Sequence, residues 1–218
     1  MHSPEQDPLP FAPHGLLEKL SQGRDVLLTA LGDSLTYGWM VDRGYLDFLG
    51  QTLRFRYPAS RLAIINRGIP GDTAESGLRR IRRDILDLNP DGVLVQYALN
   101  DAFMGYTLSS FRCSMEGIIK EIRAYGDAEI VLVTSVYLEE PREYKQALLF
   151  YGEMESLSRK YRLPLARVHI HWEQCIGSGT DLGCLVQGDL VHPTEEGYRL
   201  MAEAVAALFL PQEPSRIG

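Results

Sequence analysis

The chain has 218 residues, of which 45% are hydrophobic and 23% charged, and its formal net charge is −7 at pH 7. This length and apolar content favour one folded domain over a disordered chain, and the acidic balance disfavours nucleic acid as a partner. No apolar run approaches the roughly 20 residues that a membrane-spanning helix needs, so we expect no stable membrane insertion.

The two ends of the chain are expected to lie outside the domain. Prolines and acidic residues occupy the N-terminal segment, which lacks the basic start and apolar stretch of a signal peptide. We therefore expect an N-terminal tail (residues 1–20), one domain (21–212) and a C-terminal tail (213–218) in a cytoplasmic protein. Three cysteines without a CxxC pair indicate reduced thiols, although their spacing also permits a Cys175–Cys184 disulfide.

Strand and helix patterns alternate along the chain. A continuous apolar segment predicts a buried strand over residues 25–31, followed by a helix over 45–57 and a second strand over 62–65. The pair Asp72 and Glu75 indicates the start of a helix that ends at Asn89-Pro90. Further strands are expected over 93–97, 130–137 and 165–168, and further helices over 109–125, 141–161 and 194–210.

This alternation predicts an α/β fold, a three-layer α/β/α sandwich around a five-stranded parallel sheet. In such sheets, ligands bind outside the carboxyl ends of the strands. Polar segments follow several of the predicted strands: Gly32-Asp33-Ser34, Gly68 to Asp72, Asn100-Asp101 and Asp189-x-x-His192. We therefore expect their side chains at one edge of the sheet.

These segments contain the groups that serine-dependent ester hydrolysis needs. Ser34 lies where a strand turns towards a helix and unpaired N–H groups can bind an oxyanion, although a lone serine there is also a common helix N-cap. Asp189 and His192 are three residues apart, so the carboxylate can orient the imidazole that accepts the serine proton. The Asn100 amide and the Gly71 N–H can donate to developing negative charge, although each residue is also typical of a turn.

Four segments resemble the sequence blocks of the SGNH (GDSL) hydrolase family. They are residues 32–35 (GDSL), 66–72 (NRGIPGD), 98–101 (ALND) and 189–193 (DLVHP). The resemblance spans about residues 25–208 and implies a flavodoxin-like sandwich with strand order 2-1-3-4-5. It also implies Ser34 as the nucleophile, His192 as the base and Asp189 as its orienting carboxylate. The implied oxyanion hole consists of the Ser34 and Gly71 N–H groups and the Asn100 side chain.

Several further residues are given provisional roles. Ala98 replaces the glycine of the third block, which is allowed if its φ is negative. The large side chains near the Ser34 and Asn100 segments are tentative substrate-binding residues, although ordinary packing explains them equally well; they are Trp39, Met40, Phe103 and Met104.

Two groups of charged or titratable residues are interpreted as structural. His169 and His171 would face the same side of a strand, but no cluster of further ligands accompanies them, so we expect neither a metal nor a cofactor. Four arginines are expected to form a solvated helix face rather than an anion-binding patch; they are Arg79, Arg80, Arg82 and Arg83.

The leading hypothesis is therefore a serine esterase or acylhydrolase that cleaves small carboxylic esters or thioesters through an acyl-enzyme. A non-catalytic ligand-binding domain with the same fold is the alternative. A metal-dependent phosphodiesterase that uses His169 and His171 is a distant third. The natural substrate and the oligomeric state stay open at this point.

Overall fold

A five-stranded parallel sheet forms the centre of the molecule. The computed structural model describes residues 11–210, and its strands are β1 (Val26–Gly32), β2 (Leu62–Gly68), β3 (Gly92–Gln96), β4 (Glu129–Val133) and β5 (Leu165–Ala166). Neighbouring strands pair in parallel, in the order β2-β1-β3-β4-β5. The fold class and strand order expected from the sequence are confirmed.

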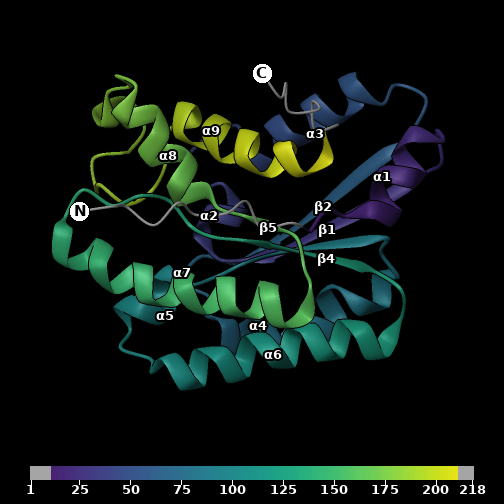
Figure 1. The fold of residues 1–218 in the computed structure, drawn as a ribbon, viewed down its shortest axis with the longest axis horizontal. Helices are drawn as coiled ribbons and strands as arrows, with labels where there is room; N and C mark the ends of the chain where they lie inside the picture. The colour runs from purple at the N-terminus through teal and green to yellow at the C-terminus, as the bar shows by residue number, and fades with distance from the viewer. Residues whose placement is uncertain (1–10, 211–218) are drawn as a thin grey trace, which may run out of the picture.

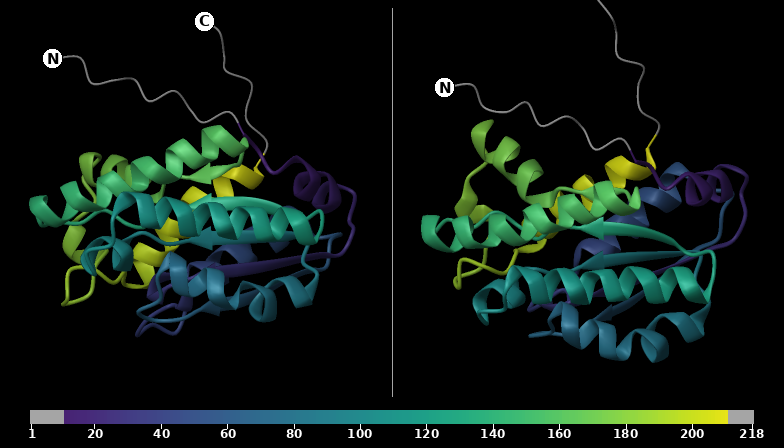
Figure 2. Two further views of the ribbon diagram at one scale, coloured as in Figure 1. Left: turned by 90° about the horizontal axis from the view of Figure 1, so that it is seen from below. Right: turned by 60° about the horizontal axis from the view of Figure 1, so that its bottom comes forward.

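Helices cover both faces of this sheet, which gives the molecule three layers (Figures 1 and 2). One layer contains α3 (Tyr45–Arg56), α8 (Val168–Gly177) and α9 (Glu195–Ala206). The other contains α4 (Ala74–Asp84), α5 (Leu99–Phe103), α6 (Leu108–Tyr125) and α7 (Pro141–Tyr161). The short helix α2 (Ser34–Tyr37) follows β1, and 3₁₀ turns lie at Leu86–Leu88, Leu182–Cys184 and Ala207–Phe209. No helix in the described part of the chain is both long and apolar enough to cross a membrane.

The core lies between the sheet and the two helical layers. Every residue of β3 is buried, as expected for a central strand that helices cover on both faces. The stripe of Tyr198, Met201 and Val205 on α9 is completely buried. A core of this kind holds the strand ends in fixed positions, and the candidate site depends on those positions.

Helix α1 (His14–Ser21) lies in the expected N-terminal tail except for its last residue, and it was not predicted. Its Leu16 and Leu20 side chains are each 1% exposed and belong to the core. The Glu129 carboxylate accepts the N–H groups of Gly15 and Leu16, at 3.1 and 2.6 Å, in place of an N-cap side chain. This segment therefore packs on the domain. Residues 1–10 of the expected tail, and all of 213–218, lie outside the described residues.

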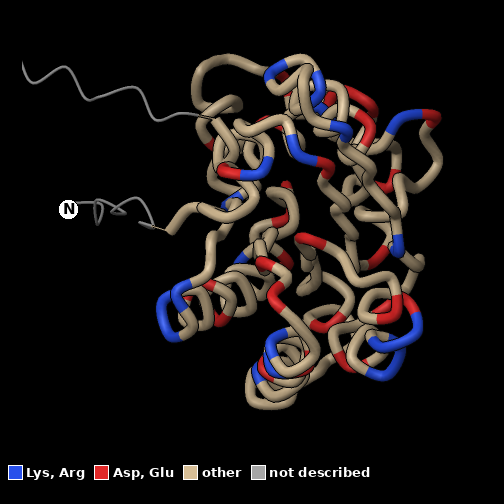
Figure 3. The backbone as a smooth tube through the Cα atoms, turned by 90° about the vertical axis from the view of Figure 1, so that its right-hand side faces the viewer, with Lys and Arg blue, Asp and Glu red and all other residues tan. Residues whose placement is uncertain are grey.

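Charges at this end of the molecule are mixed in sign. Lys19 on α1 pairs with Asp91, which precedes β3, at 2.5 Å. Figure 3 views the molecule from the α1 side and shows acidic and basic positions interspersed along the chain.

Two strands are shorter than predicted. β4 ends at Val133 instead of residue 137, because its neighbours β3 and β5 end opposite that residue, at Gln96 and Ala166. β5 covers only Leu165–Ala166, and Val168 already begins α8, which the sequence analysis missed. All three cysteines are free, so the Cys175–Cys184 disulfide is not formed.

Candidate active site

Three of the four predicted polar segments meet at the carboxyl edge of the sheet, around a pocket of about 220 Å³. Its lining residues are Asp33, Ser34, Leu35, Leu99, Asn100, Phe103, Asp189, Val191 and His192. The pocket thus combines polar groups from three distant segments with apolar side chains next to them.

Ser34, His192 and Asp189 form one continuous hydrogen-bonded chain. The Ser34 Oγ lies 2.9 Å from His192 Nε2, and His192 Nδ1 lies 2.6 Å from Asp189 Oδ2. The other Asp189 oxygen accepts the N–H groups of Val191 and His192, at 3.0 and 2.9 Å. Burial alone would raise the pKa of Asp189, but these hydrogen bonds outweigh it and hold the pKa below its usual value. Asp189 is therefore ionised at neutral pH and can balance a positive charge on the imidazole.

The turn that presents Ser34 depends on its two preceding residues. A Cβ on Gly32 would lie 2.1 Å from the Thr36 hydroxyl oxygen, so only glycine fits there. The buried Asp33 side chain caps α2 by accepting the Leu35 N–H at 2.9 Å, and it also accepts the Gln96 amide at 3.2 Å. Burial raises the pKa of Asp33 to about 7, against these two hydrogen bonds.

The three expected oxyanion donors belong to separate segments. Within the described chain, no acceptor takes the backbone N–H of Ser34 or of Gly71. Gly71 has φ +78°, a conformation that favours glycine, and it belongs to an exposed turn rather than to the pocket lining. Asn100 lines the pocket, and its Nδ2 donates to the Asp72 carbonyl at 2.9 Å. An amide nitrogen carries two hydrogens, so one of them stays available.

Ala98 does not meet the condition of a negative φ under which the sequence analysis allowed alanine at this position. Ala98 has φ +136° and is completely buried at the turn between β3 and α5. A side chain is strained in this conformation. Asn100 lines the pocket two positions after Ala98. The strained residue is therefore close in sequence to a predicted oxyanion donor.

The four tentative substrate-binding residues have different positions. Phe103 lines the pocket. The centroid of the Trp39 ring lies 5.9 Å from the centroid of the His192 ring. Met40 lines a separate, more open depression together with Val41, Asp42 and Glu195. Met104 is 59% exposed and lines neither. The sequence analysis missed Leu35, Leu99 and Val191, although each one directly follows or precedes a motif residue.

The two histidines of the metal hypothesis do not share a face. Both lie on α8 rather than on a strand, and residues two apart on a helix point in different directions. His169 is buried and its Nδ1 lies 2.8 Å from the Thr134 hydroxyl, whereas His171 lies 3.3 Å from Glu203. Among the described residues, no group of three or more His, Cys, Asp or Glu side chains could hold a metal ion.

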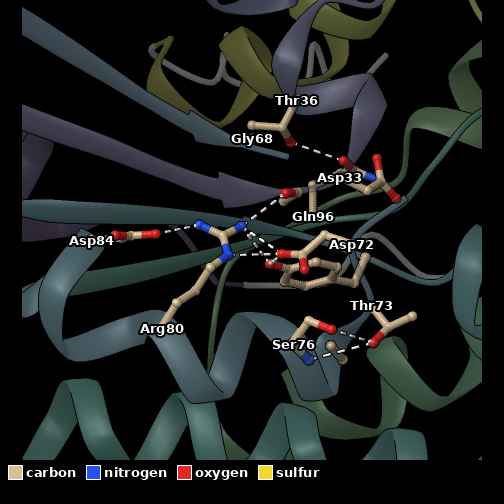
Figure 4. A network of polar contacts seen from close by, with 12 residues as sticks. Asp33, Thr36, Gly68, Asp72, Thr73, Ser76, Arg80, Asp84 and Gln96 are labelled. Atoms are coloured by element: carbon tan, nitrogen blue, oxygen red, sulfur yellow. Dashed lines mark hydrogen bonds and ion pairs between the residues drawn. The ribbon is translucent and has the colours of Figure 1, made fainter. Parts of the chain in front are cut away.

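The expectation of a solvated arginine face is wrong for one of its four members. The Arg80 side chain is only 9% exposed and reaches the buried carboxylates of Asp72 and Asp84 (Figure 4).

Tyr198 is a further residue whose polar role was missed. Its hydroxyl accepts the Trp39 N–H at 3.1 Å and donates to the Ser34 carbonyl at 3.4 Å. Nothing in the sequence distinguishes this tyrosine from an ordinary core residue of α9.

Comparisons with known proteins identify the family and agree with the fold. The sequence model of the GDSL-like Lipase/Acylhydrolase family matches residues 30–200. "Thioesterase 1/protease 1/lysophospholipase L1" of Escherichia coli K12 is 25% identical, over 93% of this chain and 92% of that protein. The arylesterase of Vibrio mimicus is also 25% identical, over 87% of this chain and 90% of its own length.

A solved structure extends the likeness to the fold. The acetylxylan esterase Axe2 of Geobacillus stearothermophilus superimposes with a TM-score of 0.77 at 18% identity, covering 88% of this chain and 97% of its own. Its catalytic mutants carry alanine in place of a serine, an aspartate or a histidine. The chain belongs to the GDSL-like lipase/acylhydrolase family, and its expected class, a carboxylic ester hydrolase, is confirmed.

Proposed function

We propose that this member of the GDSL-like family hydrolyses small carboxylic esters or thioesters through an acyl-enzyme on Ser34. The observation that carries the proposal is the continuous hydrogen-bonded chain from Asp189 through His192 to Ser34. Nucleophile, base and orienting carboxylate lie in the order that covalent acyl transfer needs. The same three residue types are the ones replaced in the catalytic mutants of the acetylxylan esterase.

In the acylation step, Ser34 Oγ attacks the carbonyl carbon of the substrate while His192 Nε2 takes its proton. The ionised Asp189 stabilises the imidazolium and holds its Nδ1 hydrogen. The tetrahedral intermediate then collapses, and His192 returns the proton to the departing oxygen or sulfur. A water molecule attacks the acyl-enzyme with His192 again as the base, which releases the carboxylic acid and restores Ser34.

The oxyanion of each tetrahedral intermediate would accept the N–H groups of Ser34 and Gly71 and the second Asn100 hydrogen. Two features support this assignment. The two backbone N–H groups have no acceptor in the described chain, and the first Asn100 hydrogen is already held by the Asp72 carbonyl. Donors fixed before the reaction need no reorganisation when charge develops, and for that reason they lower the barrier.

The pocket supports a small acyl group. Its volume of about 220 Å³ is below the range of roughly 300–1,000 Å³ that drug-sized ligands occupy. Apolar side chains from Leu35, Leu99, Phe103 and Val191 form part of its wall. Relatives named as an arylesterase and an acetylxylan esterase are consistent with short esters as substrates, and a relative whose name includes thioesterase is consistent with thioesters.

The test combines covalent labelling with turnover. A fluorophosphonate probe should label the wild-type protein and the Ser110→Ala control, whose exposed serine lies at the start of α6, but not Ser34→Ala. Hydrolysis of p-nitrophenyl acetate should disappear with the label. Acetyl and other short esters and thioesters should be cleaved faster than long-chain ones. Labelling or full turnover in Ser34→Ala would reject the nucleophile, and absence of both from the wild type would favour a non-catalytic binding domain.

A further inference from the structure

Arg80 is buried and reaches the end of β1, the strand that leads to Ser34. Its side chain is 9% exposed, whereas those of Arg79, Arg82 and Arg83 on the same helix are 68%, 80% and 75% exposed. Burial of a charged group is costly unless its partners are arranged around it. The surroundings of this one arginine therefore indicate a specific role.

All three nitrogens of the Arg80 guanidinium have partners (Figure 4). Nε and Nη2 lie 2.8 and 2.6 Å from Asp72 Oδ2, and Nη1 lies 2.9 Å from Asp84 Oδ2. Nη2 also donates to the Gly32 carbonyl and to the Tyr97 hydroxyl, each at 3.1 Å. The planar group thus contacts β1, the turn after β2 and the end of β3 at once.

Each of these contacts adjoins one proposed oxyanion donor. Gly32 lies two residues before Ser34, Asp72 directly follows Gly71, and Tyr97 lies three residues before Asn100. We propose that Arg80 is a positioning residue that holds the three donor segments in register. This inference rests on the proposed function, because it concerns the same oxyanion hole.

The Gly32 carbonyl connects the first two donor segments. It accepts the Arg80 guanidinium and also the Ile69 N–H, at 3.0 Å, from the turn that carries Gly71. A Cβ added to Gly71 would have no heavy atom within 4 Å, so little packing holds this exposed turn from the side. Its position depends on the hydrogen bonds at Ile69 and Asp72, and Arg80 takes part at both of these points.

The connection to Asn100 runs through Asp72 and Tyr97. The Asp72 carbonyl accepts the Asn100 amide at 2.9 Å, while the Asp72 carboxylate is held by Arg80 and by the Tyr97 hydroxyl at 3.0 Å. A Cβ on Gly77 would lie 2.2 Å from that hydroxyl, so α4 can approach Tyr97 only because it carries glycine at this point. A shift of the guanidinium would therefore displace both the carbonyl that orients Asn100 and the strand end that leads to it.

The local charge argues for positioning rather than for direct electrostatic stabilisation. The Arg80 charge is opposed by the carboxylates of Asp72 and Asp84 at hydrogen-bond distance. The two carboxylates largely cancel the electric field of the Arg80 charge at the reacting atoms. The hydrogen bonds of the planar guanidinium still fix the positions of the groups that it contacts.

The first test is Arg80→Lys, which keeps the charge but replaces the planar fork by a single ammonium group. We expect kcat for p-nitrophenyl acetate to fall on the order of 10- to 100-fold, because displaced catalytic groups cost about this much. KM should change by less than about threefold, since the oxyanion exists only in the transition state. The matched control is Arg83→Lys, whose exposed side chain also pairs with Asp84 and which should retain wild-type kcat and KM.

A double-mutant cycle separates positioning from general stability. If Arg80 acts in part through Asn100, Arg80→Lys should lower kcat by a smaller factor in the Asn100→Ala background than in the wild type, and the loss that remains reflects the Ser34 and Gly71 segments. An equal loss of kcat in the two backgrounds, a change in KM alone, or a kcat for Arg80→Lys equal to that of Arg83→Lys would overturn the proposal. If Arg80→Lys does not fold, Tyr97→Phe replaces it, because this change removes only the hydroxyl that bridges Arg80 and Asp72. Its effect on kcat is then compared between the wild-type and Asn100→Ala backgrounds, with the same criteria.

The controls keep this proposal distinguishable from the proposed function. Turnover retained in Ser34→Ala, or absent from the wild type, would overturn the proposed function and with it the role of Arg80. An inactive Ser34→Ala beside a fully active Arg80→Lys would overturn the role of Arg80 alone.

Discussion

The buried carboxyl group of Asp33 should make the stability of the protein depend on pH in a way that one substitution removes. Asp33 is 1% exposed, and burial raises its pKa from 3.8 to about 7. Between these two values the folded protein retains a proton that the unfolded chain has lost. Folded stability therefore falls as pH rises from about 4 to about 7 and is constant with respect to this group above that range.

The size of the effect follows from the change in pKa. A shift of one unit corresponds to about 1.36 kcal/mol, so the shift of about three units at Asp33 corresponds to roughly 4 kcal/mol between pH 4 and pH 7. Asn at this position does not titrate. Its side-chain oxygen can still accept the Leu35 N–H, but its amide nitrogen meets the Gln96 Nε2 donor. The clash of the two amide nitrogens lowers the free energy of unfolding of Asp33→Asn by an amount that does not depend on pH. The slope of this free energy against pH is therefore unaffected.

The difference between variants is the quantity to measure, because other groups titrate in the same range. Burial, with a smaller contribution from Arg167, lowers the pKa of His169 from 6.5 to about 3. The unfolded chain therefore binds the extra proton at this residue, and stability from His169 rises with pH over that interval. A wild-type curve alone mixes the two opposite slopes, whereas subtraction of the Asp33→Asn curve cancels His169.

The assay is urea unfolding of the wild type and Asp33→Asn at closely spaced pH values from 4 to 8.5. We expect the wild type to lose about 4 kcal/mol relative to the variant up to pH 7, with no further change above it. Asp25→Asn is the control, because its carboxylate is exposed and pairs with the exposed Arg61. A difference that stays flat with pH, or one that changes in the opposite direction, would refute the reasoning about Asp33.

Three further predictions concern the site itself. Asn100→Ala should lower kcat on the order of 10²- to 10³-fold with little change in KM, and an unchanged kcat would remove Asn100 from the oxyanion hole. Asp189→Asn should lower kcat strongly at pH 7 to 8, where the lowered pKa of Asp189 keeps the wild-type residue ionised; equal turnover would contradict its orienting role. Ala98→Gly should raise the free energy of unfolding by about 1 kcal/mol, because relief of the strain at φ +136° exceeds the entropy cost of glycine. A lower midpoint in urea would show that Ala98 is not strained.

The sequence predicted the elements whose signal is local and repeated. α7 was predicted with its observed bounds, and the central strands were found because continuous apolar runs are needed where helices cover both faces of a sheet. The fourth block was also predictable in its geometry, since Asp189 and His192 are close in sequence and one turn brings them together.

The missed features depend on contacts between distant residues. The order Val168-His-Ile-His alternates in polarity as a strand would, yet the chain forms α8 there because the short β5 ends at Ala166. Arg80 looks like its three neighbouring arginines in sequence, and the approach of Asp72 and Tyr97, from the segments after β2 and β3, distinguishes it. Periodicity reports which face of a helix is apolar, but it does not report which charged residue finds buried partners.

The strain at Ala98 can persist because the residues on both sides of it are anchored to α4 and to the turn before it. Tyr97 is held by Arg80 and Asp72, and the Asp101 carboxylate accepts the Ala74 N–H at 3.1 Å, which caps the first turn of α4. Burial raises the pKa of Asp101 to about 6, so this carboxylate is mostly ionised at neutral pH and serves as a strong acceptor. With both flanks fixed, the turn cannot relax without breaking one of these contacts, and a strained conformation survives where its surroundings determine it from two sides. The same anchors that maintain the strain also fix the direction of Asn100, which lies between Ala98 and Asp101.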